Sequence, residues 1–276
     1  MDVHAALAAA LARGESAALV TIVAAHGSTP QRVGAKMLVF ADGRTVGTIG
    51  GGCYEHDAFW KAREALTARR PRMVHYELND ELAEESGLIC GGQMDVFIEP
   101  IEPAPRLYIL GAGHVGLELG RIAPTVGFRL HVGDDREKFA NRTRFPDADE
   151  IVVDTLAEWM QREPPPPAAH VVVLTRGHRQ DFDVLRALAD RDLRYVGLIS
   201  SRAKVARLTD ALLADGVSPE WLRRLRAPVG LDIGAITPAE IAVAILAELI
   251  AALRGRLDPG GVAAPALQWT APAARE

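Results

Sequence analysis

The sequence predicts an α/β protein: a small N-terminal α+β domain followed by a Rossmann-like domain with a doubly wound parallel sheet. Three observations support this. Short β-rich runs and turns fill the first hundred residues, a proline-rich segment, EPIEPAPR, follows at 99–106, and strand-like and helix-like segments then alternate. We therefore expect domains at 1–100 and 106–256, joined by a stiff linker, and a flexible tail rich in proline and alanine at 257–276.

The first domain is expected to open with an amphipathic helix in MDVHAALAAALARGES. The β-rich runs AALVTIVAAHG and AKMLVF follow, and the Asp-Gly turn in ADGRTVGTIG predicts a hairpin with the second run. A helix is expected from about 54 to 70, because apolar residues recur there at helical spacing. The alternating segment MDVFIEP predicts the last strand of this domain.

The second domain is expected to alternate strands and helices in one parallel sheet, because its strand-like runs are short and continuously apolar. The closing helix has a clear start in TPAE, with Thr237 as N-cap, Pro238 in the first turn and Glu240 completing a capping box. Strands are expected at 106–113, 128–134, 150–154, 170–177 and 194–200, with helices at 114–127, 181–192 and 201–216.

Composition excludes several function classes. The 276 residues include 36 acidic and 31 basic side chains, so the net charge of −5 gives no overall attraction to nucleic acid or to an anionic membrane. No apolar run is long enough to cross a bilayer, and the N-terminus does not resemble a signal peptide, so we expect a cytoplasmic protein. Two cysteines in a reducing compartment favour reactive or ligand roles over a structural disulfide.

The motif GAGHVG follows a predicted strand and opens a predicted helix. In a dinucleotide-binding fold Gly111 would form the tight turn, Gly113 would let phosphate approach the backbone near His114, and Gly116 would pack helix on strand. Asp134 ends the next strand and is placed to hold a ribose hydroxyl. NAD(P) or another nucleotide is therefore a candidate ligand; the alternative is that these glycines serve only packing.

Two further segments follow strands of the same sheet, where ligands of open α/β sheets bind. LTRGHRQDFDVL places Arg176 and His178 there, with Asp181 as the expected N-cap of the next helix. In ISSRAKVARL a serine caps a helix beside Arg202, which favours an anion. An ordinary surface histidine and a solvated basic turn are the alternatives.

Both cysteines adjoin glycines. Cys53 follows a run of three glycines, of which Gly51 and Gly52 are nearest, and sits where a helix begins, a position that favours a thiolate. Cys90 precedes Gly91 and Gly92. The two thiols could therefore lie near bare backbone with room for a bulky or anionic guest, although two small buried apolar side chains are the alternative. The pair alone does not suggest a closed zinc site, which needs four ligands.

The loop HGSTPQRVGAKML lies between two predicted strands and is dense in hydrogen-bond donors. Its His26 and Arg32 would suit an anionic ligand rich in amide groups. Many loops of this polarity have no ligand.

Taken together, these motifs resemble the XdhC/CoxI family of xanthine dehydrogenase accessory proteins, from about Ala17 to Leu253. GGGCYE and ISSRAK are variants of the more usual family turns. The segments that carry the resemblance are AAHGSTPQRVGAKMLV, GTIGGGCYE, GLICGGQMDVFIEP, LYILGAGHVGLELGRIA, VVLTRGHRQDFDVL, YVGLISSRAKVARL and PVGLDIGAITPAEIAVAILAELI.

The resemblance implies a chaperone rather than an enzyme. Such a protein would bind the molybdenum cofactor, a pterin dithiolene carrying phosphate, and shield it while a cysteine desulfurase supplies a sulfido ligand. It would then deliver the cofactor to xanthine dehydrogenase or a related molybdenum hydroxylase. The resemblance also implies a homodimer.

On this interpretation Cys53, and secondarily Cys90, face the molybdenum end, with Cys53 a candidate contact to the metal. The glycine loop of the second domain would take phosphate or a nucleotide. The alternatives are an NAD(P)-dependent oxidoreductase using GAGHVG, a sulfur carrier with a persulfide on Cys53, and an interaction scaffold that has lost its ligand.

Overall fold

The computed structural model describes residues 2–78 and 92–257, apart from the side chain of Arg202. It divides into two compact units, Met1–Ala104 and Pro105–Glu276, called unit 1 and unit 2 below. Within the described ranges, no helix combines the length and the apolar character that crossing a bilayer requires.

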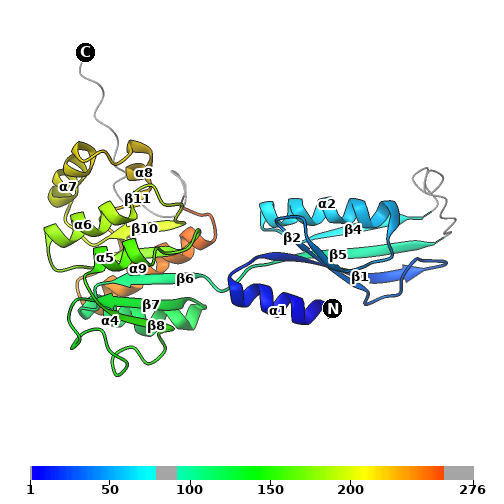
Figure 1. Cartoon of the computed structure of the whole chain (residues 1–276), viewed down its shortest axis with the longest axis horizontal. Coiled ribbons are helices and arrows are strands. Elements are labelled where there is room, and N and C mark those ends of the chain that lie inside the picture. The colour runs from blue at the N-terminus through cyan, green and yellow to red at the C-terminus, as the bar shows by residue number, and fades with distance from the viewer. Residues whose placement is uncertain (1, 79–91, 258–276) are drawn as a thin grey trace, which may run out of the picture. The chain divides into compact units, whose positions relative to one another are not determined.

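Unit 1 is a five-stranded antiparallel sheet with a helix on each face (Figure 1). The strand order is β3-β2-β1-β5-β4. Its elements are α1 (Val3–Arg13), β1 (Ala17–His26), β2 (Lys36–Phe40), β3 (Thr45–Gly47), α2 (Gly52–Ala68), β4 (Arg72–Glu77) and β5 (Gln93–Ile101).

The alternation of side chains along the strands decides what each helix covers. Met37 and Val39 of β2 pack in the core beneath α2, whereas Leu38 and Phe40 face α1. The apolar stripe expected on α2 is buried at four positions, Tyr54, Ala58, Ala62 and Ala65. The predicted hairpin is present, with β2 and β3 paired antiparallel.

The start of the expected linker belongs to the sheet instead. β5 continues to Ile101, and Pro100 lies opposite Ala18 of β1. A proline fits there because the pairing of β5 with β4 ends at Ile98, so β5 has a partner on only one side at Pro100.

Unit 2 contains a six-stranded parallel sheet in the order β11-β10-β9-β6-β7-β8. This is the Rossmann order, with the reversal between β6 and β9, and it confirms the predicted α/β class. The elements are β6 (Arg106–Leu110), α4 (His114–Ile122), η1 (Ala123–Val126), β7 (Arg129–Asp134), β8 (Glu150–Val153), α5 (Leu156–Arg162), β9 (His170–Val173), α6 (His178–Leu188), β10 (Tyr195–Leu198), α7 (Arg202–Ala214), α8 (Pro219–Arg224), β11 (Leu225–Arg226) and α9 (Pro238–Leu253).

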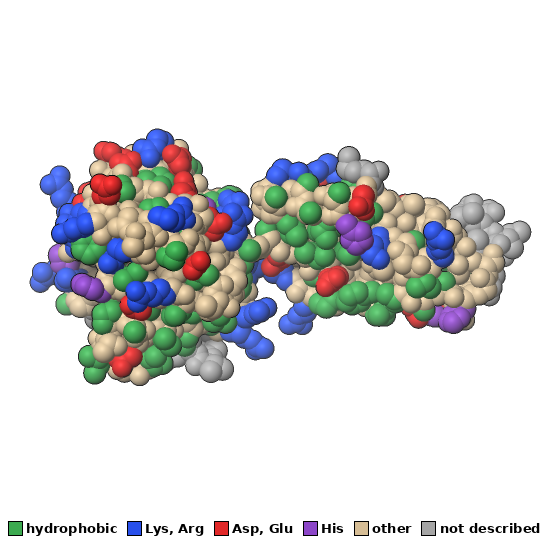
Figure 2. Space-filling view, turned by 90° about the horizontal axis from the view of Figure 1, so that it is seen from below, with side chains coloured by type: hydrophobic (Ala, Val, Ile, Leu, Met, Phe, Trp, Pro, Cys, Tyr) green, Lys and Arg blue, Asp and Glu red, His purple; other side chains and the backbone are tan. Residues whose placement is uncertain are grey.

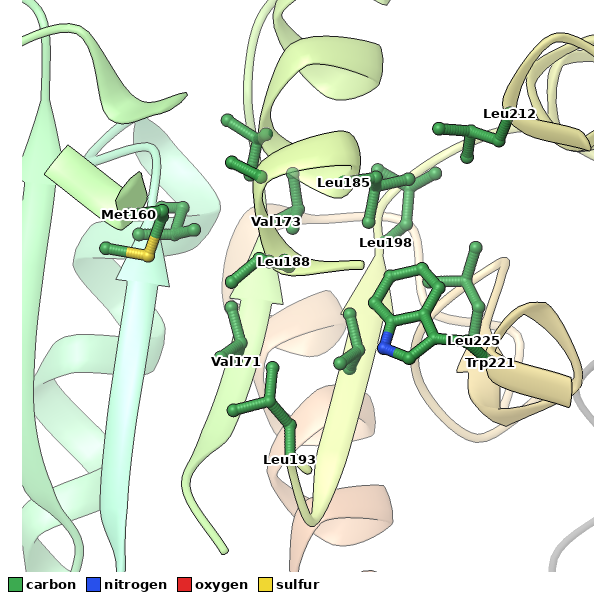
Figure 3. Close-up of a cluster of buried hydrophobic side chains, with 14 of the residues drawn as sticks. Met160, Val171, Val173, Leu185, Leu188, Leu193, Leu198, Leu212, Trp221 and Leu225 are labelled. Carbon is green, nitrogen blue, oxygen red and sulfur yellow. The ribbon is translucent and has the colours of Figure 1, made fainter. Parts of the chain in front are cut away.

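Helices cover both faces of this sheet, which is why its strands read as continuous apolar runs. Val171 and Val173 of β9 join a cluster with α6 and with Trp221 of α8 (Figure 3). Val172, between them, points to the opposite cluster, which holds α4 and α9. On the face shown in Figure 2, basic and acidic side chains are interspersed over unit 2 and form no single basic field.

The starts of three helices test the predicted caps. The capping box of α9 is confirmed, with Thr237, Pro238 and Glu240 in their expected roles. Ser201 is the N-cap of α7. The N-cap prediction for Asp181 is wrong, because α6 begins three residues earlier at His178 with Gly177 as its N-cap. Four elements, β4, α5, α8 and β11, were not predicted from the sequence.

Candidate functional site

Three segments singled out in the sequence meet at one end of unit 1. A Cβ added at Gly50 would lie 2.6 Å from Cβ of Pro30, so the glycine turn packs directly on the 26–34 loop. A Cβ at Gly92 would lie 2.4 Å from the carbonyl oxygen of Ser28 and 2.6 Å from that of His26. The absence of side chains at Gly50 and Gly92 therefore lets these backbones approach each other.

The glycine turn presents Cys53 at the start of α2. Gly50, Gly51 and Gly52 have φ angles of 127°, 76° and 71°, a succession that glycine adopts without strain. A Cβ at Gly51 would meet no atom within 4 Å, so the space beside this residue is open. Cys53 is a free thiol and is partly exposed. The structure thus combines a partly exposed cysteine with open space on the preceding backbone.

Glu55 holds this turn in place. Its Oε2 accepts hydrogen bonds from the backbone N–H of Ile49 (2.9 Å) and Gly51 (3.0 Å), and from the hydroxyl of Thr48. Burial raises the pKa of Glu55, but these donors outweigh burial, and the pKa lies below its ordinary value. This arrangement was not predicted, although an acid in the first turn of a helix was a visible signal in the sequence.

Four further residues of unit 1 were predicted to bind a ligand, and the structure describes two of them. His26, the last residue of β1, and Arg32, on the loop that packs against the glycine turn, are both exposed. Cys90 and Gly91 lie outside the described residues, so their proximity to Cys53 stays a prediction. In the described parts of the chain, no group of three or more His, Cys, Asp or Glu side chains could hold a metal ion.

In unit 2 the glycine-rich loop lies at the switch point of the sheet. A Cβ at Gly111 would lie 2.3 Å from the carbonyl oxygen of Leu174, so the loops after β6 and β9 touch there. A Cβ at Gly116 would lie 2.2 Å from the carbonyl oxygen of Gly111. At Gly113, by contrast, it would meet nothing within 4 Å. This is the division of roles that a phosphate-binding loop needs, with open space at the middle glycine.

Asp134 is bonded within the protein. Only 3% of the residue is exposed, and its carboxylate accepts from the backbone N–H of Ala112 (2.8 Å) and from the guanidinium Nε of Arg136 (2.8 Å). Burial raises the pKa of Asp134, but Arg136 and the Ala112 N–H outweigh it and hold the pKa below its usual range. The contact with a ribose stays a prediction, and a ribose would have to compete with these partners.

Other charged side chains gather at the same edge of the sheet. Arg176 donates to Asp135 at 2.6 Å, and Arg144 donates to the carbonyl oxygens of Ala112 and Gly113 at 3.1 and 3.4 Å. Arg136 lies over the ring of Phe139, 3.8 Å from its centre. Neither Arg136 nor Arg144 was predicted to lie here. His114 and His178 are exposed, and Arg202 begins α7 after β10, at the same edge of the sheet.

Asp181 lies inside the first turn of α6 rather than capping it. It is 6% exposed and accepts a hydrogen bond from the Thr175 hydroxyl at 2.6 Å. Burial raises the pKa of this carboxyl group. Asp181 therefore ties α6 to the loop after β9, a structural role with a different partner from the one predicted.

An antiparallel α+β unit with a cysteine on a glycine turn, followed by a Rossmann-type unit, defines the class of protein. Family models agree with this division. Residues 10–77 match the model described as the XdhC and CoxI family, and residues 107–249 match the XdhC Rossmann domain. The chain belongs to the XdhC/CoxI family.

Three relatives resemble most of the chain. The uncharacterized protein YqeB of Escherichia coli K12 is 37% identical over 89% of this chain, which spans only 44% of YqeB. A protein of Bacillus subtilis 168 named as a probable xanthine dehydrogenase subunit is 26% identical, covering 90% of this chain and 96% of the relative. The molybdenum cofactor insertion chaperone PaoD of E. coli K12 is 28% identical, covering 87% and 84%.

A solved structure agrees with the fold. A Bacillus halodurans protein described as a xanthine dehydrogenase has a TM-score of 0.51 to this chain and 26% identity. The match covers 95% of this chain and 98% of that one. The likeness therefore extends over both units.

Two glycines of one loop should respond differently to substitution. Gly111→Ala should lower the free energy of unfolding by about 2 kcal/mol or more, because the methyl group meets backbone and φ is 120°. Gly113→Ala should cost less than about 1 kcal/mol, because its backbone is extended and its surroundings are open. Urea unfolding of the two variants checks this, and an equal decrease in the free energy of unfolding for both variants would contradict it.

Asp134→Asn should destabilise the protein at neutral pH by about 1 to 3 kcal/mol, because Arg136 and the Ala112 N–H lose a charged acceptor. The folded-state pKa is depressed, so this stabilisation exists above the unfolded pKa of about 3.9 and is lost as the pH falls through the folded value. The difference in free energy of unfolding between the wild type and Asp134→Asn, measured by urea unfolding, should therefore become smaller at acidic pH.

Asp135→Asn is the control for that experiment. It removes the same charge from the neighbouring residue, which pairs with the exposed Arg176 at 2.6 Å and with Arg136 only at the longer distance of 3.6 Å. The change should lower the free energy of unfolding by less than about 1 kcal/mol. If Asp135→Asn lowers the free energy of unfolding as much as Asp134→Asn does, the stabilising role of the buried Asp134 carboxylate is contradicted.

Proposed function

We propose that this protein binds the molybdenum cofactor, protects it while a cysteine desulfurase adds the terminal sulfido ligand, and inserts it into xanthine dehydrogenase or a related molybdenum hydroxylase. It acts in the cytoplasm as a homodimer. The cofactor is its cargo rather than a resident group. The single observation that carries the proposal is the partly exposed Cys53 thiol beside the open glycine turn, in a chain of the XdhC/CoxI family.

The chemistry of the turn suits one end of such a cargo. Cysteine sulfur is the type of ligand that soft metal–sulfur centres accept, and Cys53 is a free, partly exposed cysteine. The open space at Gly51 leaves room for a guest that a side chain would displace. His26, at the end of β1, and Arg32, on the adjoining loop, are exposed and could offer donors to a pterin or its phosphate. Cys90 is proposed as a second contact.

The relatives support the accessory role. One is named as a molybdenum cofactor insertion chaperone and another as a probable component of xanthine dehydrogenase. Both are matched over more than four fifths of their own length.

The switch point of unit 2 favours a second, separate proposal: a phosphate group or nucleotide beside Gly113. The open space at this glycine supports it. An NAD(P)-dependent oxidoreductase is the competing interpretation of the same loop. Titration with NADH, followed by fluorescence, separates the two, since saturable binding with turnover would favour the oxidoreductase.

The main proposal is tested by expression in a host that makes molybdopterin. The purified protein is oxidised, and the released pterin is measured by fluorescence. The parent should carry pterin, and Cys53→Ala should carry about tenfold less, because it loses the proposed sulfur contact. Cys90→Ala should show a smaller loss.

Activation of a client hydroxylase is the second readout. If both single variants retain cofactor as well as the parent and activate the client equally, the assignment of the cysteines is wrong. A parent protein that carries no pterin would count against the chaperone function itself.

A further inference from the structure

Glu55 reaches back beyond the helix on which it lies. α2 begins at Gly52, yet the carboxylate of Glu55 bonds the N–H of Gly51 and of Ile49, which precede the helix. An acid that served only the helix dipole would need no bonds outside the first turn. The contacts of Glu55 therefore define the path of the chain that leads into Cys53.

The hydrogen bonds at the turn form a closed set. The hydroxyl of Thr48 donates to Glu55 and accepts from the N–H of Gly50 at 3.0 Å. The backbone N–H groups of Ile49, Gly50 and Gly51 are consequently all bonded, two directly to Glu55 and one through Thr48. Three successive glycines have little conformational preference of their own, so this set is what fixes their left-handed backbone.

The same hydrogen bonds affect which chemical group of a ligand can bind at this turn. Free N–H groups at a glycine turn beside a helix start attract anions. Here the carboxylate of the protein already occupies them, so a phosphate group gains little at Ile49 and Gly51. The turn keeps its open space at Gly51 and its thiol at Cys53 for a different chemical group.

We propose that Glu55 is the positioning residue of the cargo site: its carboxylate fixes the 48–52 turn and so sets the direction in which Cys53 meets the molybdenum end of the cofactor. This inference rests on the proposed function. Glu55 itself need not touch the cargo. Its effect passes through the backbone of the glycine turn.

The experiment uses the full chain carrying Cys90→Ala, so that Cys53 is its single thiol. Glu55→Gln keeps the size of the side chain and removes its charge. The amide hydrogens of Ile49 and Gly51 should exchange about tenfold faster in this variant, measured by NMR below the global unfolding limit. Cys53 should also react several-fold faster with iodoacetamide, because a loosened turn exposes the sulfur more often.

Two further variants keep the test decisive. Glu64→Gln makes the same charge change on the exposed side of α2, where Glu64 pairs with Arg72, and should leave both rates within about twofold of the parent. Thr48→Val removes one donor to Glu55 and the acceptor of Gly50 N–H, and should shift both rates in the same direction as Glu55→Gln but by less.

The outcomes separate this inference from the proposed function, because the first two readouts need no cofactor. Unchanged amide exchange and alkylation in Glu55→Gln would overturn the positioning role. Faster rates together with a several-fold loss of bound pterin would support it at the cargo site. Faster rates with full pterin retention would overturn the link between this turn and the cargo, while the cysteine variants test the function independently.

Discussion

A carboxylate bonded to the backbone N–H of a glycine-rich turn is the interaction on which both candidate sites depend. Glu55 does this in unit 1 at Ile49 and Gly51, and Asp134 does it in unit 2 at Ala112. Each backbone N–H in such a turn needs an acceptor, and leaving one unbonded away from water is costly. An acid supplied by a neighbouring element removes that cost and selects one conformation of the turn.

Features encoded by short spacing could be predicted from the sequence. The Asp-Gly hairpin, the stripe on α2 and the capping box of α9 each depend on residues close together in the chain. The strands of the parallel sheet in unit 2 pair over longer separations, but each strand and helix has its own local pattern. The GAGHVG motif likewise predicted close backbone packing at Gly111 and open space at Gly113, because each glycine of the motif has a fixed role in a phosphate-binding loop.

Contacts that depend on tertiary packing could not be predicted in this way. Aspartate is a residue type that often caps helices, but the N-cap of α6 is Gly177. Asp181 is instead buried and accepts a hydrogen bond from the Thr175 hydroxyl. The bonds of Arg144 to carbonyl oxygens more than 30 residues away leave no local pattern. Helix α8 could have been predicted, since Ser218, Pro219 and Glu220 form a recognisable helix start.

The internal bonding of the glycine turn in unit 1 bears on how a carrier works. A surface whose shape is set by its own protein has no ordering to undergo when a guest arrives and none to lose when the guest departs. Loading and unloading then follow from contacts with the guest alone. Under the proposed function, a turn already held by its own hydrogen bonds would favour rapid loading and rapid release of the cofactor.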